Sequence, residues 1–249
     1  MNIYKFFIYI KYFYYFHKLW FTLLVYKLHL IFFKTQSMKL TNILYNDIQN
    51  NGCIIIKLIQ WLHTRYNTFY TETTDTNLYN LLSLFNNVFE KCNIHDLKYS
   101  KQLFKKEFPN NFYDQIIFDE NFKIKSGSIA QVYKGILKSN KQEIAIKITH
   151  PDLNEQMLFP YLYFLLYNWL TNKIPLLNKY KIPFEMCDFF NNFSKQTNMI
   201  NEAKNLKYFY KEYKNNPLIL IPKPIIWSKN ILIMEYIEAT QFSKLEISD

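Results

Sequence analysis

A single lysine in the middle of the chain has a spacing and neighbours that suit phosphate binding. In the segment EIAIK, which ends at Lys147, isoleucines alternate with other residues as they do along a β-strand, so Ala145 and Lys147 share the face opposite them. An alanine there leaves room for an adenine ring, and an ammonium beside it can reach the phosphates of a nucleotide. A lysine in a half-buried position needs an anionic partner, since removing one member of a buried pair costs about 3–5 kcal/mol.

Glu202, in the segment NEAKN, is the candidate partner of this lysine. It falls within residues 185 to 214, where apolar residues recur with helical spacing. A single glutamate on a helix is more often a solvated surface acid. The ion pair is therefore a hypothesis that depends on how the strand and the helix are placed.

The elements that must position these two residues follow from the hydrophobic spacing. Residues 40 to 108 have a helical period, and the period changes to two from Phe122. The clearest predicted elements are helices over 76–89, 152–171 and 185–214, and strands around 129–134, 144–148, 225–227 and 231–237. Strands, a glycine-containing turn, a lysine strand and then a glutamate helix follow one another as in the amino-terminal lobe (N-lobe) of a protein kinase. The sequence therefore predicts an α+β fold with an antiparallel sheet.

Five segments resemble, in the right order, those of the UbiB-type atypical kinase family, the kinase-like proteins of ubiquinone biosynthesis. They are KLIQWLHTR (57–65), SGSIAQVYKG (126–135), EIAIKITHPDL (143–153), QTNMINEAKNL (196–206) and ILIMEYIEA (231–239). The resemblance spans about residues 52 to 249 and implies a kinase-like N-lobe preceded by a helical extension. All four alanines and the one arginine fall within these segments, as do Gly127 and Gly135, which indicates positions where a bulky side chain would not fit.

The resemblance implies an ATP site. The turn from Ser126 to Ala130 would lie over the phosphates and bind them through backbone N–H groups, although one glycine in a tight turn more often marks an ordinary hairpin. The backbone from Glu235 to Ile237 would bind adenine, with Met234 guarding the back of the pocket. The residues implied in nucleotide binding are Lys147, Glu202, Ser126, Gly127, Ser128, Ala130, Ala145, Glu235, Ile237, Lys57 and Gln60.

Lys57 and Gln60 lie three residues apart on one face of a predicted helix. In the family such a helix lies across the nucleotide site. This chain has Ile59 where the family pattern has glycine, and a β-branched side chain at a close-packed contact could cost about 1–3 kcal/mol. Without the resemblance, the two residues would be a solvent-facing polar pair.

The amino terminus is basic and aromatic. The first acidic residue is Asp47, and six lysines precede it. The longest stretch without lysine there is the eight residues from Leu19 to Tyr26, whereas a membrane span needs roughly 20 apolar residues. A clean transmembrane helix is therefore not predicted. We interpret residues 1–46 as a targeting or membrane-surface segment, with an ordinary aromatic-rich helix as the alternative.

Composition argues against several other functions. The chain carries a formal charge of +10, but 29 of its 30 basic residues are lysine, whereas nucleic-acid binding favours arginine and a clustered patch. No specific nucleic acid partner is therefore expected. Cys53, Cys92 and Cys187 are far apart and form no CxxC motif, so neither a disulfide framework nor a zinc site is predicted.

A kinase also needs a carboxy-terminal lobe with a catalytic aspartate and metal ligands after the hinge. The chain ends at Asp249, so we expect that lobe to be absent and the chain to be the amino-terminal part of a longer protein. Asp188 with the two phenylalanines after it, and the run from His150 to Asn154, resemble kinase motifs but precede the hinge. We expect Asp188 to begin a helix and Asp152 to cap one.

The expected domains are the segment 1–46, a helical extension over 47–110 and the N-lobe over 111–249. By resemblance, the whole protein would be an ATP- and Mg²⁺-dependent atypical kinase or ATPase linked to ubiquinone biosynthesis. It would be membrane-associated in the mitochondrion or another organelle, close to an isoprenoid lipid or to ubiquinone-biosynthesis proteins. The alternative is a non-catalytic scaffold that binds nucleotide or lipid. RNA binding is a distant third, because the lysines are spread along the whole chain.

Overall fold

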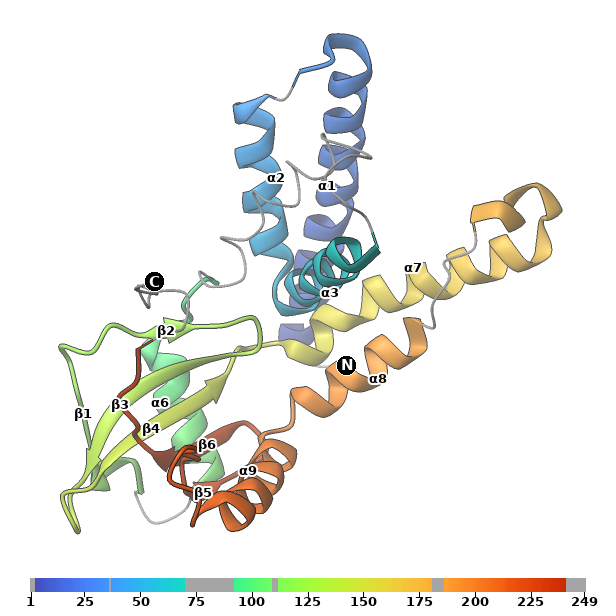
Figure 1. The fold of residues 1–249 in the computed structure, drawn as a ribbon. Helices are drawn as coiled ribbons and strands as arrows, with labels where there is room; N and C mark the ends of the chain where they lie inside the picture. Colours follow the sequence, from blue (N-terminus) through green and yellow to red (C-terminus); the bar gives the residue numbers. More distant parts are fainter. Residues whose placement is uncertain (1–2, 36, 70–91, 109–111, 181–185, 241–249) are drawn as a thin grey trace. The chain divides into compact units, whose positions relative to one another are not determined.

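The structure is a computed structural model of the 249-residue chain. It describes residues 3–35, 37–69, 92–108, 112–180 and 186–240 (Figure 1). The chain divides into two compact units, and each is discontinuous in sequence. Unit 1 comprises Met1–Ile94, Ser126–Ala130 and His150–Thr197, and unit 2 comprises His95–Lys125, Gln131–Thr149 and Asn198–Asp249.

Unit 1 is helical in its described part. Its elements are α1 (Ile3–Phe33), α2 (Met38–Asn51), α3 (Cys53–Phe69), α7 (Leu153–Lys173), the 3₁₀-helix η2 (Pro175–Tyr180) and α8 (Met186–Gln196). Helix α1 packs against α2 and α7. Ser37 caps the start of α2, because its hydroxyl accepts a bond from the Leu40 N–H at 3.4 Å. Helices adjacent in sequence and helices far apart in sequence thus pack together in this unit.

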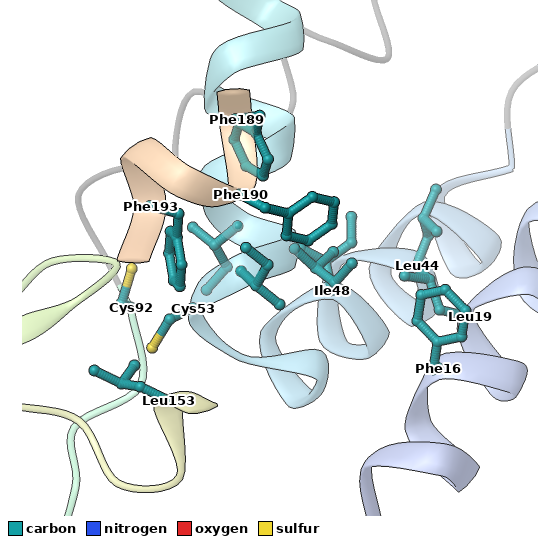
Figure 2. Packing of buried hydrophobic residues seen from close by; sticks show 13 residues of the cluster. Phe16, Leu19, Leu44, Ile48, Cys53, Cys92, Leu153, Phe189, Phe190 and Phe193 are labelled. Carbon is teal, nitrogen blue, oxygen red and sulfur yellow. The ribbon is translucent and has the colours of Figure 1, made fainter. Parts of the chain in front are cut away.

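The core of unit 1 is contributed by α1, α2, α3, α7 and α8, together with Cys92, which lies outside the helices. Figure 2 shows how its side chains pack. Its buried residues are Phe16, Leu19, Leu44, Ile48, Cys53, Ile54, Ile55, Ile56, Cys92, Leu153, Phe189, Phe190 and Phe193. Gly52 joins α2 to α3 with φ +81°, and a side chain there would collide with Gln156. The Gln156 amide oxygen in turn accepts a 2.7 Å bond from the Cys53 N–H, which satisfies a free donor at the start of α3.

Helix α1 is continuous over 31 residues. In the described part of the chain it is the one helix long and apolar enough, by length and composition, to cross a membrane. A buried helix of a soluble domain or an amino-terminal targeting segment would meet the same criteria. Phe16 and Leu19 of α1 belong to the core of unit 1, so one side of the helix packs on protein.

Unit 2 is an α+β structure. Its elements are α6 (Leu97–Glu107), the 3₁₀-helix η1 (Phe112–Gln115), α9 (Met199–Tyr213) and the strands β1 (Ile116–Phe118), β2 (Lys125–Ser126), β3 (Ala130–Leu137), β4 (Glu143–Thr149), β5 (Pro224–Trp227) and β6 (Ile231–Glu235). The sheet has the order β1-β3-β4-β6-β5, and β2 pairs with β3. The two ends of β2 and β3 that meet at the turn, Ser126 and Ala130, belong to unit 1.

One face of this sheet and α6 enclose the core of unit 2. The residues that share this core are Leu103, Phe104, Phe108, Ile116, Tyr133, Leu137, Ile144, Ile146, Ile148, Ile231 and Ile233. All three isoleucines of β4 are fully buried. The alternation predicted from EIAIK is therefore confirmed, and Lys147 lies on the face of β4 that does not enter this core.

The structure confirms the predicted α+β class and most of the predicted elements. The helices expected over 152–171 and 185–214 are present, the second divided at Thr197 into α8 and α9. Strand β1 was not predicted, and the helix expected over 76–89 lies outside the described residues. One prediction is wrong: Asp152 stands before α7, but it has left-handed backbone (φ 60°) and its side chain makes no capping bond.

Candidate functional site

Lys147 and Glu202 form an ion pair in unit 2. Lys147 lies in β4 and Glu202 in the first turn of α9, and the Lys147 Nζ donates to Oε1 at 2.7 Å and to Oε2 at 2.8 Å. The side chains are 26% and 36% exposed. The contact predicted from the sequence is therefore present, and the ammonium is held by the helix while it still faces solvent.

The strand register shows what surrounds this ammonium. Strand β4 pairs antiparallel with β6, with Ala145 opposite Met234 and Lys147 opposite Leu232. Residues directly opposite one another project from the same face of a sheet. Ala145, Met234 and Leu232 therefore form the apolar surroundings of Lys147, and the small side chain at 145 keeps that surface low, as the sequence predicts.

The start of α9 is fixed on both sides of Glu202. The Asn198 side chain caps the helix by accepting a 3.1 Å bond from the Ile200 N–H, and the Met199 N–H donates to the Lys229 carbonyl at 2.9 Å. Met199 and Ala203 are fully buried. These contacts set the rotation of the helix, and that rotation directs Glu202 towards the lysine.

The predicted hinge follows β6. The Glu235 N–H donates to the Lys223 carbonyl at 2.9 Å, and the Tyr236 N–H donates to the Glu143 carbonyl at 3.2 Å. Both donors are therefore already bonded. An adenine ring would have to bond to the carbonyl oxygens of this segment or to the N–H of Ile237. Fewer backbone groups are therefore open to adenine than the resemblance implies.

The predicted phosphate turn, from Ser126 to Ala130, lies in unit 1. The Gly127 N–H donates to the Ala130 carbonyl at 3.0 Å, so this group is not open to a phosphate, and the anion nest expected there loses one donor. Ser126, Ser128 and Ala130 are buried. Gly127 has no positive φ, and an added Cβ would meet its nearest neighbour at an ordinary 3.7 Å. Neither lack of room for a side chain nor backbone conformation therefore explains why residue 127 is a glycine.

His150 holds that turn, a role that the sequence reasoning missed. Its Nε2 lies 2.9 Å from the Gly127 carbonyl and 3.4 Å from the Ser126 hydroxyl, and its backbone N–H donates to the Ile129 carbonyl at 2.9 Å. Burial lowers the pKa of His150, although the bond to the carbonyl opposes this. A neutral imidazole that carries its proton on Nε2 satisfies these contacts. In the sequence, His150 stands out only as the start of a run that resembles a kinase motif.

Lys57 and Gln60 lie on α3 in unit 1. Both side chains are half-buried, and the Gln60 carbonyl accepts a 2.5 Å bond from the Thr64 hydroxyl. Ile59 packs against the core of unit 1. The isoleucine thus has an apolar environment to fill, while the nucleotide role of Lys57 and Gln60 stays a prediction, as does that of the turn.

Glu107, the last residue of α6, was not singled out from the sequence. Its carboxylate accepts bonds from the Ser228 hydroxyl, from the Asn230 side-chain amide and, at 3.2 Å, from the Asn230 N–H. These contacts join residues more than 120 positions apart in the chain. No local pattern could have indicated them.

The described residues contain no group of three or more His, Cys, Asp or Glu side chains that could hold a metal ion. Cys53 and Cys92 are buried and Cys187 is exposed, all three as free thiols. The described residues thus offer no ready cluster of such ligands for magnesium.

Several known proteins are similar to this chain. Residues 87–249 match the family model described as the ABC1 atypical kinase-like domain. The probable serine/threonine-protein kinase abkC of Dictyostelium discoideum is 26% identical over 200 residues, which cover 78% of this chain and 27% of that protein. The probable protein kinase UbiB of Blochmanniella pennsylvanica is 26% identical over 196 residues, covering 76% of this chain and 34% of that protein.

A plant protein is also similar to this chain. The chloroplastic protein ACTIVITY OF BC1 COMPLEX KINASE 3 of Arabidopsis thaliana is 29% identical over 131 residues, which cover 49% of this chain and 17% of that protein. The chain spans about a third or less of the length of these relatives. The resemblance to UbiB-type kinases is confirmed, and since the family model matches most of its length, the chain belongs to the ABC1 atypical kinase-like family.

Proposed function

We propose that this chain binds ATP through unit 2, with Lys147 contacting the phosphates and Glu202 holding the ammonium in place. The observation that carries the proposal is the contact of Nζ with both carboxylate oxygens, at 2.7 and 2.8 Å. A lysine ammonium is strongly hydrated and flexible on its own. A helix carboxylate restricts it to one place, and its partial exposure leaves room for an anionic ligand.

The surface around Lys147 supports an adenine beside the phosphates. Ala145 and Met234 lie opposite one another on the same face as the lysine, and the backbone from Glu235 to Ile237 continues from β6. An apolar surface with a few backbone groups at its rim is typical of sites for flat aromatic ligands. ATP therefore fits this surface better than a simple phosphate does.

The reaction of the whole protein is part of the same proposal. Two relatives are named as probable protein kinases, and the UbiB-type resemblance supports an atypical kinase or ATPase linked to ubiquinone biosynthesis. Magnesium would neutralise phosphate charge in such a reaction. A non-catalytic scaffold that binds nucleotide is the alternative, and it predicts ATP binding without turnover in the whole protein.

The location we propose is a membrane of the mitochondrion or another organelle. The Arabidopsis relative is named as chloroplastic. Within unit 1, α1 and α7 expose large apolar side chains, among them Phe7, Phe21, Phe32, Leu166 and Trp169. Exposed apolar surface beside lysines suits a lipid surface or an isoprenoid. Co-flotation of the chain with anionic vesicles tests this, and a chain that stays at the bottom of the gradient would count against it.

Thermal unfolding of the 249-residue chain with and without MgATP tests the nucleotide proposal. At a ligand concentration of about 100 times Kd, binding stabilises a protein by about 2.7 kcal/mol. We expect this stabilisation in the wild type and its loss in Lys147→Met. Lys207→Met is the matched control, since it removes one positive charge from an exposed position on α9 of the same unit. Equal stabilisation of both variants would exclude Lys147 from the site.

A further inference from the structure

The two elements that carry Lys147 and Glu202 both bond to one turn of the chain, Ser228–Asn230. The Lys229 carbonyl accepts the N–H of Met199, the first residue of α9, at 2.9 Å. The next carbonyl, that of Asn230, accepts the N–H of Thr149, the last residue of β4, at 3.0 Å. Glu202 lies three positions after Met199 in α9, and Lys147 lies two positions before Thr149 in β4. A movement of this turn would therefore displace both partners.

Glu107 fixes that turn. Its carboxylate accepts from three donors, the Ser228 hydroxyl, the Asn230 side-chain amide and the Asn230 N–H. Both carboxylate oxygens accept hydrogen bonds: Oε1 accepts from the Asn230 side chain, and Oε2 accepts from the Ser228 hydroxyl and the Asn230 N–H. Hydrogen bonds to a charged group are about twice as strong as neutral ones, so this carboxylate ties α6 firmly to the turn.

The position of Glu107 in its own helix shows that α6 does not need it. It is the last residue of α6, where the helix dipole favours cations and disfavours a carboxylate. The preceding residues Lys105 and Lys106 follow that preference. A glutamate at this end is explained by its contacts with the turn, not by the stability of the helix.

We propose that Glu107 is a positioning residue for nucleotide binding: through the Ser228–Asn230 turn it holds α9 and β4 so that Glu202 and Lys147 meet. This rests on the proposed function, since it names a residue that governs the same site without touching the ligand. Met199 and Ala203, which are fully buried, carry the effect from the turn to Glu202.

The test is ATP affinity of the 249-residue chain, measured by titration in Glu107→Leu and Glu107→Gln. Glu107→Leu should weaken ATP binding by about 3- to 30-fold, which is the typical effect of mutating a residue that acts on a site without touching the ligand. Glu107→Gln should retain most of the affinity. The amide oxygen of the new glutamine can accept from the Ser228 hydroxyl and the Asn230 backbone N–H, and the Asn230 side-chain amide can rotate so that its oxygen accepts from the glutamine NH₂ group. Glu212→Leu makes the same chemical change as Glu107→Leu, at an exposed site on α9, and should bind ATP like the wild type.

A second arm separates positioning from a general loss of stability. In a Glu202→Gln background the ion pair is already broken, so Glu107→Leu should weaken ATP binding by a smaller factor than it does in the wild-type background. Full additivity of the two losses, or wild-type affinity in Glu107→Leu, would overturn the proposal. If Glu107→Leu does not fold, Asn230→Ala, which removes one of the three donors, takes its place in the same comparison.

Amide hydrogen exchange of the nucleotide-free chain distinguishes this proposal from the proposed function. If Glu107 positions α9, the amide of Met199 should exchange faster in Glu107→Leu than in Glu212→Leu. This holds even if the wild type binds no ATP, an outcome that would contradict the proposed function alone. Unchanged exchange at Met199 would refute the positioning role itself.

Discussion

Replacing Gly135 by alanine should destabilise the sheet that carries Lys147. Gly135 lies on β3 opposite Phe118 of β1. A Cβ at this position would lie 3.0 Å from the Ile117 carbonyl oxygen, 3.1 Å from Ile116 Cγ2 and 3.2 Å from Ile146 Cδ1. The first of these atoms is backbone, so strand β1 itself must shift to relieve the contact.

The size of the effect follows from two opposing terms. Overpacking in a tight core costs about 1–3 kcal/mol, and the reduced entropy of the unfolded chain returns about 0.4–1 kcal/mol, so Gly135→Ala should lower the free energy of unfolding by about 1–2 kcal/mol. Gly127→Ala is the matched control. Its added Cβ would meet the Ala130 carbonyl at 3.7 Å and its φ is not positive, so only the second, stabilising term applies.

Hydrogen exchange of peptides from β1 and β3 measures the two variants separately from the helices of unit 1. Gly135→Ala should open these strands more often than the wild type, and Gly127→Ala should not. If the two alanine variants protect β1 and β3 equally, the close approach at Gly135 does not constrain the sheet and the reasoning is refuted.

Three further predictions concern thiols, pH and the ion pair. Burial raises the pKa of Cys92 to about 11 and also raises the pKa of Cys53. A thiol reagent should therefore modify only the exposed Cys187 in the native chain and all three cysteines after denaturation. Modification of a second cysteine in the native chain would contradict this. Burial lowers the pKa of His150 from 6.5, so the unfolded chain takes up the proton first, and the stability that neutral His150 provides should be full above pH 6.5 and fall as the pH drops below it. His150→Gln should lose less stability than the wild type on acidification, and an equal loss would argue against a buried neutral imidazole. Because the ion pair is partly exposed, Lys147→Met should reduce the free energy of unfolding in urea by about 1 kcal/mol, and a loss above about 3 kcal/mol would indicate a buried structural pair instead.

Local patterns were sufficient for the elements around Lys147. The alternation of isoleucine in EIAIK predicts a strand with a buried face, and Ile144, Ile146 and Ile148 are all fully buried. Three of the four alanines, those at 130, 145 and 203, are also buried, whereas Ala239 is exposed. Scarce small residues thus marked packed positions in most cases, because composition bias against alanine leaves it mainly where space requires it.

Features made by long-range contacts were not predictable. Strand β1 has three residues, too few to show a period, and it is defined by its pairing with β3. Glu107 meets a turn more than 120 residues away, and Asp152 stands before α7 without capping it. For β1 and Glu107 the partner lies elsewhere in the chain, so neither propensity nor spacing contains the information, whereas at Asp152 the left-handed backbone (φ 60°) goes with the missing cap.

The central claim, that Lys147 meets the phosphates of ATP, can be tested most directly with an acyl-phosphate derivative of ATP, which transfers its acyl group to a lysine beside the phosphates. After digestion, mass spectrometry reads which of the 29 lysines is acylated. The account predicts acylation of Lys147 that excess unmodified ATP suppresses. Labelling spread over surface lysines and insensitive to ATP, with Lys147 unmodified, would contradict it.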